Sequence, residues 1–209
     1  MPPSFLDHLT VTAPTLEAGV ALVERALGVT PGPGGQHPRM GTHNRLLRLG
    51  PTMFLEVIAP DPSAAAQDRP RWFAFDTLAF DAVPTLATWV VRVDDIDARA
   101  AASSEPLGPV EPMHRGALDW RITIPADGAL VLDGVAPALI AWHAETHPAE
   151  RMFDAGLTLR RLDLFHPEPA RIVRLLDGLA LDAPVSVLPG AARLVAHIDT
   201  PLGMRTLSC

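Results

Sequence analysis

Hydrophobic and polar residues alternate along residues 5–12 (FLDHLTVT), and this period of two predicts a strand. Residues 15–27 (TLEAGVALVERAL) instead place leucines and valines on one face of a helix. Residues 42–49 and 52–59 return to strand character and are joined by a turn at Gly50 and Pro51. The pattern predicts a unit with the order strand, helix and then strands.

The same order recurs about eighty residues later in the chain. Residues 86–93 predict a strand, and residues 94–102 predict a helix that has aspartates near its N-terminus. Three further strands are predicted over residues 109–115, 118–125 and 137–143. Two matching orders in one chain indicate an internal repeat of βαβββ type.

The C-terminal part of the chain can form a third unit of this order. Residues 157–165 predict a strand and residues 168–179 a helix, and short strands are expected over 184–188, 191–198 and 202–207. The expected fold class is α+β. The predicted division is a first module over 1–60, a connector over 61–84, a second module over 85–145 and a βαβββ-like extension over 155–209.

Composition narrows the class of protein further. The 209 residues are 48% hydrophobic with a net charge of -7 and no block of like charges, which argues against a nucleic-acid-binding face or a polybasic membrane patch. The single cysteine, Cys209, rules out an internal disulfide framework. Residues 1–8 lack the features of a signal peptide, and no run of 18 uncharged apolar residues occurs. We therefore expect a cytoplasmic protein.

Four segments of the first module resemble the vicinal-oxygen-chelate superfamily, and within it the glyoxalase-like domain branch. They are the strand FLDHLTV at 5–11, the helix end LGV at 27–29, the loop HPRMGTHN at 37–44 and the strand FLEVIAP at 54–60. The resemblance extends, less strongly, to about residue 143. It implies two βαβββ modules that curl one mixed sheet into a cup.

The resemblance also implies chemistry, because the first and last strands of each module supply metal ligands in this superfamily. Glyoxalase I, extradiol dioxygenases and fosfomycin-resistance enzymes chelate vicinal substrate oxygens on a divalent metal in this way. Bleomycin-resistance proteins keep the cup and bind a ligand without metal. The expected partner is therefore a small molecule, and the chain could act as a monomer or a homodimer.

His8 and Glu56 are the candidates for the metal ligands of the first module. A neutral imidazole binds Zn, Ni, Mn or Fe, although His8 could also be a half-exposed strand histidine. A carboxylate in the apolar strand around Glu56 is costly unless it is paired, and it could act as a ligand or as a catalytic base. An edge-strand glutamate in solvent is the alternative.

The second module departs from the metal pattern. A shift of 80 residues aligns Thr88 with His8, and a shift of 85 aligns Ala141 with Glu56. Neither is a firm ligand, and two protein ligands hold a metal poorly, so an incomplete metal site is expected. His143 is the first candidate for a third ligand, since it shares a strand face with Ala141.

Thr88 and four further residues are candidates for binding substrate. Asn44 can orient a carbonyl or hydroxyl group, or cap a turn. Arg121 can bind a carboxylate or phosphate, or pair with Glu56. His37 and His43 flank a loop that could cover the cup. Two functions stay open: a glyoxalase-like lyase, isomerase or dioxygenase for an oxygen-rich substrate, and a metal-free binder of a small ligand.

Overall fold

The computed structural model describes residues 2–144 and 146–208 and shows an α+β fold, as expected. Its helices are α1 (Leu16–Leu27), α2 (Ile96–Ala102) and α3 (Pro169–Gly178), with short 3-10 helices η1 (Pro38–Met40), η2 (Phe75–Thr77), η3 (Val131–Gly134) and η4 (Pro148–Arg151). Its strands are β1 (Ser4–Thr12), β2 (Gln36–His37), β3 (Thr42–Gly50), β4 (Met53–Pro60), β5 (Thr85–Arg92), β6 (Val110–Arg115), β7 (Leu118–Thr123), β8 (Ala138–Trp142), β9 (Thr158–His166), β10 (Leu181–Asp182), β11 (Val185–Pro189), β12 (Arg193–Thr200) and β13 (Gly203–Leu207).

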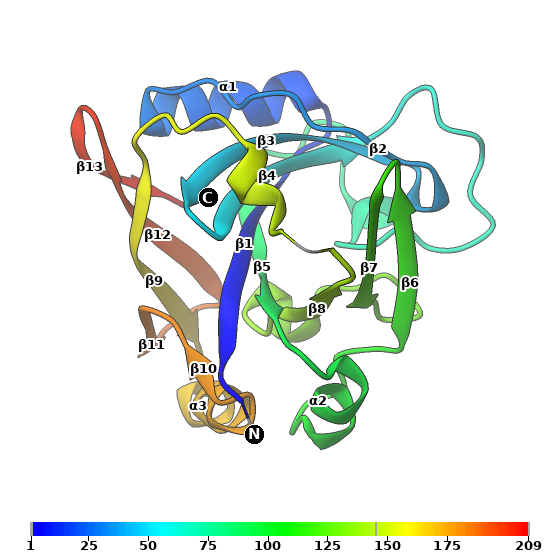
Figure 1. The fold of residues 1–209 in the computed structure, drawn as a ribbon, viewed down its shortest axis with the longest axis vertical. Coiled ribbons are helices and arrows are strands. Elements are labelled where there is room, and N and C mark those ends of the chain that lie inside the picture. Colours follow the sequence, from blue (N-terminus) through cyan, green and yellow to red (C-terminus); the bar gives the residue numbers. More distant parts are fainter. Residues whose placement is uncertain (1, 145, 209) are drawn as a thin grey trace.

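The first two modules form one strongly curved, mixed sheet with the order β2-β3-β4-β1-β5-β8-β7-β6 (Figure 1). In each module the first strand pairs in parallel with the last, so β1 lies beside β4 and β5 beside β8. The antiparallel pair of β1 and β5 joins the modules. Curvature brings the two edge strands together, and Arg39 after β2 contacts Glu111 on β6.

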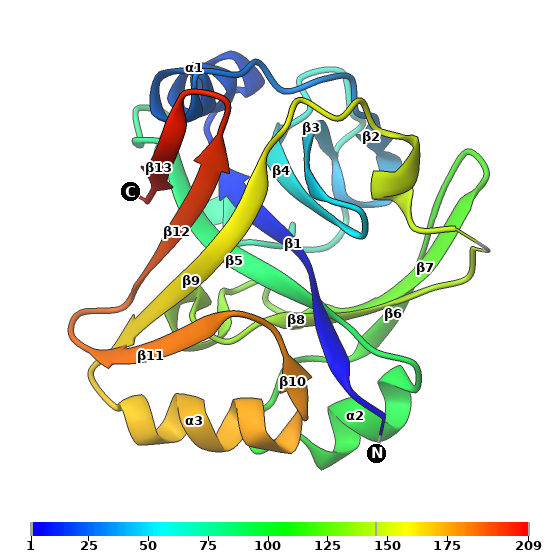
Figure 2. The same cartoon turned by 60° about the vertical axis from the view of Figure 1, so that its left-hand side comes forward.

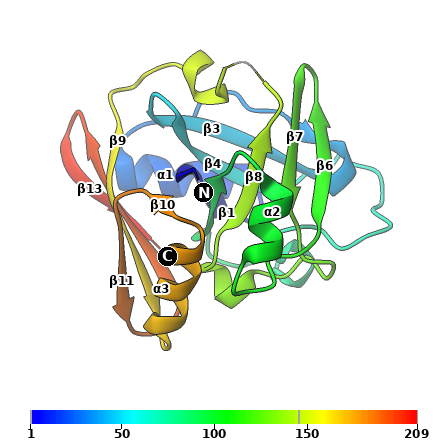
Figure 3. The same ribbon diagram turned by 60° about the horizontal axis from the view of Figure 1, so that its bottom comes forward.

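The C-terminal unit repeats the element order but not the strand pairing. Its sheet has the order β11-β9-β12-β13, and its first strand, β9, pairs in parallel with β11 rather than with the last strand (Figure 2). The short strand β10, which the sequence pattern did not predict, leaves this unit and pairs with β1 (Figure 3). The extension is therefore tied into the first module through the backbone.

Two hydrophobic clusters lie on opposite faces of the curved sheet. Leu9 and Val11 of β1 belong to the outer cluster, which also includes residues of α1, α2, α3 and the C-terminal sheet. His8 and Thr10 point the other way, toward the concave face. The inner cluster fills part of that face and includes Trp72 and Phe75 of the connector between β4 and β5. The connector therefore covers part of the concave face of the sheet.

Helix α1 has the ends that its sequence predicts. The Thr15 side chain accepts a hydrogen bond from the amide of Ala18, and Gly28 adopts a left-handed conformation with φ of 73°. Gly19 faces the sheet, where a Cβ atom would lie 2.5 Å from a methyl group of Val57. No helix of the described residues has the length and apolar character needed to cross a bilayer.

Candidate functional site

A β-bulge in β1 determines where the candidate site begins. Leu6 pairs with Val91 and His8 pairs with Val90, so Asp7 is an extra residue on β1. A regular strand would point the side chains of Asp7 and His8 to opposite faces. The bulge instead brings Oδ1 of Asp7 to 2.7 Å from Nδ1 of His8.

Asp7 is completely buried, yet it has enough partners to stay ionised. Its Oδ2 accepts hydrogen bonds from Nε1 of Trp142 and Nε2 of His147, both at 2.9 Å, and lies 3.6 Å from a guanidinium nitrogen of Arg92. Burial alone would raise the pKa of Asp7, but the hydrogen bonds from His147 and His8 hold this pKa well below its usual range. Asp7 is a fixed negative charge behind His8.

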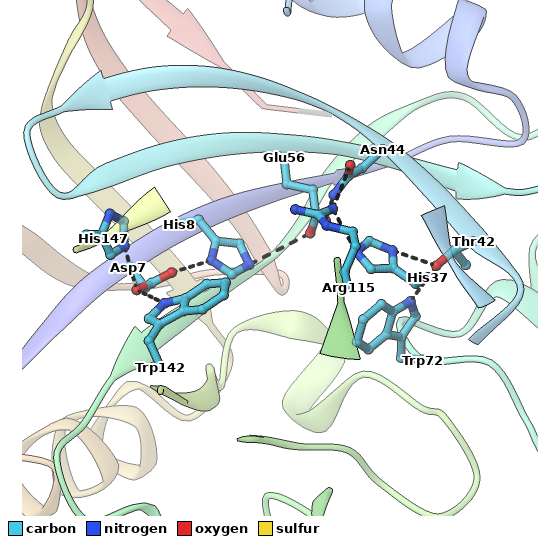
Figure 4. A network of polar contacts seen from close by, with 10 residues as sticks. All are labelled: Asp7, His8, His37, Thr42, Asn44, Glu56, Trp72, Arg115, Trp142 and His147. Atoms are coloured by element: carbon cyan, nitrogen blue, oxygen red, sulfur yellow. Dashed lines mark hydrogen bonds and ion pairs between the residues drawn. The ribbon is translucent and has the colours of Figure 1, made fainter. Parts of the chain in front are cut away.

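This carboxylate orients the His8 ring and selects its tautomer. Because Asp7 can only accept, the proton of the neutral ring resides on Nδ1, and Nε2 is left as a base. The ring stacks on Phe54 with centroids 4.5 Å apart. Nε2 lies 3.7 Å from Oε2 of Glu56, and both side chains are buried. Figure 4 shows the resulting line from Asp7 through His8 to Glu56.

Glu56 is held by Asn44, whose amide orientation follows from its neighbours. Oδ1 of Asn44 accepts from the amide of Gly35 at 2.8 Å and from Arg115 at 3.2 Å, so Nδ2 is the group that donates to Glu56, at 2.6 Å (Figure 4). Asn44 thus links the carboxylate to Arg115 of the second module.

His37 on β2 is a neutral member of the site. Its Nε2 lies 3.3 Å from Arg115, which can only donate, so Nδ1 carries the proton and faces the hydroxyl of Thr42 at 3.2 Å. Burial is the main reason why the pKa of His37 falls to about 4. Trp72 meets its ring edge-on at 5.1 Å. His37 is therefore uncharged near pH 7 and adds no positive charge to the site.

These groups line one small cavity in the cup. Aromatic and aliphatic side chains complete its wall. The lining residues are His8, His37, Asn44, Leu46, Phe54, Glu56, Trp72, Phe73, Arg115, Trp120, Ile122, Ile140, Trp142 and Pro148. A cavity that is mostly apolar but contains a few convergent polar groups is typical of a small-molecule site.

The structure brings four of the predicted site residues together: His8, Glu56, Asn44 and His37. Thr88 is buried on β5 but lines an adjacent apolar pocket. His43 follows Thr42 in β3 and lies on the face opposite Asn44. Thr88 and His43 are therefore not part of the cavity wall that the other four residues share.

Arg121 and His143 lie outside the cavity. Both line an open groove near the N-terminus of α2, where Arg121 makes two hydrogen bonds to Asp97, at 2.6 and 2.7 Å. The expected alternative for Arg121, an ion pair with Glu56, is wrong. His143 is exposed and is separated from His8, so it does not complete a site with it.

Comparisons with known proteins agree with this architecture. The glyoxalase-like domain matches residues 6–180, which is most of the chain. The chain belongs to the glyoxalase-like domain family. This confirms the resemblance to the vicinal-oxygen-chelate superfamily. A search of curated proteins finds no match.

Solved structures with this family's fold include proteins of known and unknown activity. A hypothetical protein from Staphylococcus aureus has a TM-score of 0.67 at 11% identity, with 91% of this chain and 88% of that chain covered. A methylmalonyl-CoA epimerase in complex with methylmalonyl-CoA and NH4+ has a TM-score of 0.47 at 21% identity, with 70% and 100% covered. The epimerase from Mycobacterium tuberculosis has 0.40 at 18%, with 66% and 85% covered. At 11% identity, the match to the Staphylococcus aureus protein establishes a likeness of fold alone.

The repeat of the glyoxalase-like domain family corrects one alignment made from sequence. Glu56 pairs with Thr10, and the residue that matches Thr10 after a shift of 80 is Val90, which pairs with Ala138. Ala138, not Ala141, is therefore the counterpart of Glu56. The shift of 85 differs from the shift of 80 by an odd number of residues. Because side chains alternate between the two faces of a strand, the shift of 85 selected a residue on the outer face.

The donors in the cup do not fit the metal site of the superfamily. His8 and Glu56 have Thr88 and Ala138 as counterparts, and neither of those supplies a firm ligand. Oε1 of Glu56 already accepts from Asn44. Within residues 2–144 and 146–208, no group of three or more His, Cys, Asp or Glu side chains could hold a metal ion. The chemistry considered below therefore rests on the side chains themselves.

Three residues of the site were missed from the sequence: Asp7, Arg115 and His147. Strand alternation alone places Asp7 on the face opposite His8, and the bulge that breaks this alternation cannot be read from the sequence. Arg115 lies at the end of β6 and reaches a different module, and His147 arrives from a loop. An Asp directly before a His in a strand was the one available signal.

Proposed function

We propose that the chain is a glyoxalase-like enzyme, an isomerase or lyase that removes a proton from a carbon next to a carbonyl group of a small, oxygen-rich molecule. The observation that carries this proposal is the orientation of His8. A buried carboxylate fixes Nδ1, and Nε2 lies beside Glu56 in the wall of a mostly apolar cavity. A base in this geometry acts without a metal, so the dioxygenase alternative has no support from the donor set.

The proton-transfer step uses groups that surround His8. Nε2 takes the proton from the substrate carbon, and the electrons of the C–H bond move to the carbonyl oxygen to form an enolate. The imidazolium then lies between Asp7 at 2.7 Å and Glu56 at 3.7 Å, and both carboxylates stabilise its charge. Asn44 has a second amide N–H with which to contact the enolate oxygen. When the carbon that loses the proton carries a hydroxyl group, the hydroxyl proton moves to the enolate oxygen. Delivery of the proton from Nε2 to the former carbonyl carbon then completes an isomerisation.

Deuterium exchange tests this step without knowledge of the natural substrate. NMR would follow exchange at the carbons next to the carbonyl of pyruvate, hydroxyacetone and acetoacetate in D2O. We expect catalysed exchange with at least one compound, and His8→Asn should slow it by about 100-fold or more, since the general base is lost. His143→Asn, on the outer groove, is the matched control and should exchange like wild type.

A non-catalytic binder is the second candidate, and the incomplete ligand set of the second module favours it. In a binder the cavity would hold one of these compounds without exchanging its protons. Binding without exchange would support the binder. Catalysed exchange that His8→Asn leaves unchanged would instead reject His8 as the base.

A further inference from the structure

Arg115 connects the second module to the cavity wall of the first. It is the last residue of β6, and Gly116 with φ of 59° begins the turn to β7. From this turn the guanidinium reaches β2 and β3 at the opposite edge of the curved sheet. Its Nη1 lies 3.2 Å from Oδ1 of Asn44 and 3.3 Å from Nε2 of His37 (Figure 4).

The two hydrogen-bond partners of Arg115, Asn44 and His37, are neutral side chains. Other arginines of the structure, such as Arg121 and Arg171, contact carboxylates directly. In the described part of the chain no carboxylate lies within 4.0 Å of Arg115. Burial lowers its pKa, and only the more distant charge of Glu56 opposes that effect. A half-buried cation without an ion pair is costly to maintain.

The guanidinium also has donors to spare. Both of its hydrogen bonds to described residues use Nη1, so Nε and Nη2 donate to no described residue, and Arg115 is part of the cavity wall. A guanidinium offers two parallel N–H groups that match the two oxygens of a carboxylate. The nearby negative charge of Glu56 favours a monoanion over a doubly charged phosphate.

We propose that Arg115 binds the carboxylate of the substrate, so that the natural substrate is a small carboxylic acid with a carbonyl or hydroxyl group. This inference rests on the proposed function only for the reaction, because the anion site can be tested by binding alone. Arg115 would hold the carboxylate end of the molecule while the reacting carbon faces Nε2 of His8.

The test compares charged and neutral forms of the same small molecules. NMR titrations would measure the binding of pyruvate, lactate and acetoacetate, with methyl pyruvate and inorganic phosphate as further probes. We expect wild type to bind at least one of the three acids, and Arg115→Gln to weaken that binding by about 10- to 100-fold, the effect of losing hydrogen bonds to a charged group. Arg115→Lys keeps the charge without the planar fork and should fall between the two.

Two comparisons separate a binding role from a structural one. Methyl pyruvate should bind wild type and Arg115→Gln equally, because it lacks the anionic group that Arg115 recognises. Arg121→Gln, which removes an arginine from the outer groove, should bind the acids like wild type.

Three results would overturn the inference: failure of all three acids to bind, equal binding of the acids by Arg115→Gln, or tighter binding of phosphate than of any acid. None of these depends on proton exchange by His8. Conversely, Arg115-dependent binding without exchange would reject the proposed reaction and leave the carboxylate site standing.

Discussion

Asp7 connects the proposed base, His8, to the loop that follows β8. It is fully buried, it orients His8, and it accepts from Trp142 and His147 in the second half of the chain. One carboxylate therefore serves both the base and the packing of the loop that follows β8. A substitution at this position should change activity and stability together.

Asp7→Asn tests this dual role. An amide has one accepting oxygen where the carboxylate has two, and it carries no charge. Exchange activity should therefore fall by about 100-fold, and the free energy of unfolding by about 1.5 to 3 kcal/mol. The pKa of folded Asp7 lies below its unfolded value of about 3.9, so the carboxylate stabilises the fold above that pH. That stabilisation is lost as the pH falls through the folded pKa.

Urea unfolding at several pH values would measure the effect. The difference between wild type and Asp7→Asn should be largest near neutral pH and should shrink below about pH 4. Asp119→Asn is the control, since Asp119 contacts His114 at the surface at 2.6 Å and its loss should change stability by less than about 1 kcal/mol. A difference that does not depend on pH would contradict the assigned charge.

The sequence indicates His8 and Glu56 as candidates but not the groups that orient them. His8 is recognisable as a histidine in an alternating strand, Glu56 as a carboxylate in an otherwise apolar strand, and both through the resemblance to the superfamily. The position of Asp7 depends on a bulge in β1. The position of Arg115 depends on the sheet curvature that brings β6 to β2, where Arg115 contacts His37. Neither a bulge nor sheet curvature follows from a period of two.

At the scale of elements, the close packing of α1 on β4 depends on Gly19. The helix was predicted correctly from its hydrophobic face and its caps, but the sequence pattern did not show that this glycine is a point of contact. A Cβ atom at Gly19 would approach Val57 to 2.5 Å and Ala13 to 3.0 Å. Glycine is unfavourable inside a helix, so packing must outweigh its low helix propensity here.

Gly19→Ala should therefore destabilise the protein by about 1 to 3 kcal/mol, because the added methyl group forces α1 away from the sheet. Gly178→Ala is a matched control at the end of α3, where an added Cβ meets nothing within 4 Å. The control should gain up to about 1 kcal/mol from helix propensity. Denaturant unfolding measures both, and a stabilised Gly19→Ala would show that the helix can shift at little cost.

At the scale of the whole molecule, the C-terminal unit shares its core with the first two modules. Its element order was predictable from periodicity, but its different strand pairing and its attachment were not, since both depend on contacts distant in sequence. Ser4 on β1 donates to the carbonyl of Leu179 at 2.7 Å, and Glu105 near α2 pairs with Arg171 on α3 at 2.6 Å. Figure 3 shows α3 and β10 beside the beginning of β1.

A shared core predicts that the chain unfolds as one cooperative unit, and the tryptophans make this measurable. All four, Trp72, Trp89, Trp120 and Trp142, belong to the cup, and Trp89 lies in the core that the cup shares with the C-terminal sheet, so their fluorescence follows the unfolding of the cup. Ile198→Ala removes a fully buried side chain from β12 and should cost about 2 to 5 kcal/mol. Tryptophan fluorescence and far-UV circular dichroism should then shift together to lower denaturant. A fluorescence transition that stays at its wild-type midpoint would show instead that the cup folds independently of the C-terminal sheet, and the contacts of β10 with β1 would then contribute little to the stability of the site.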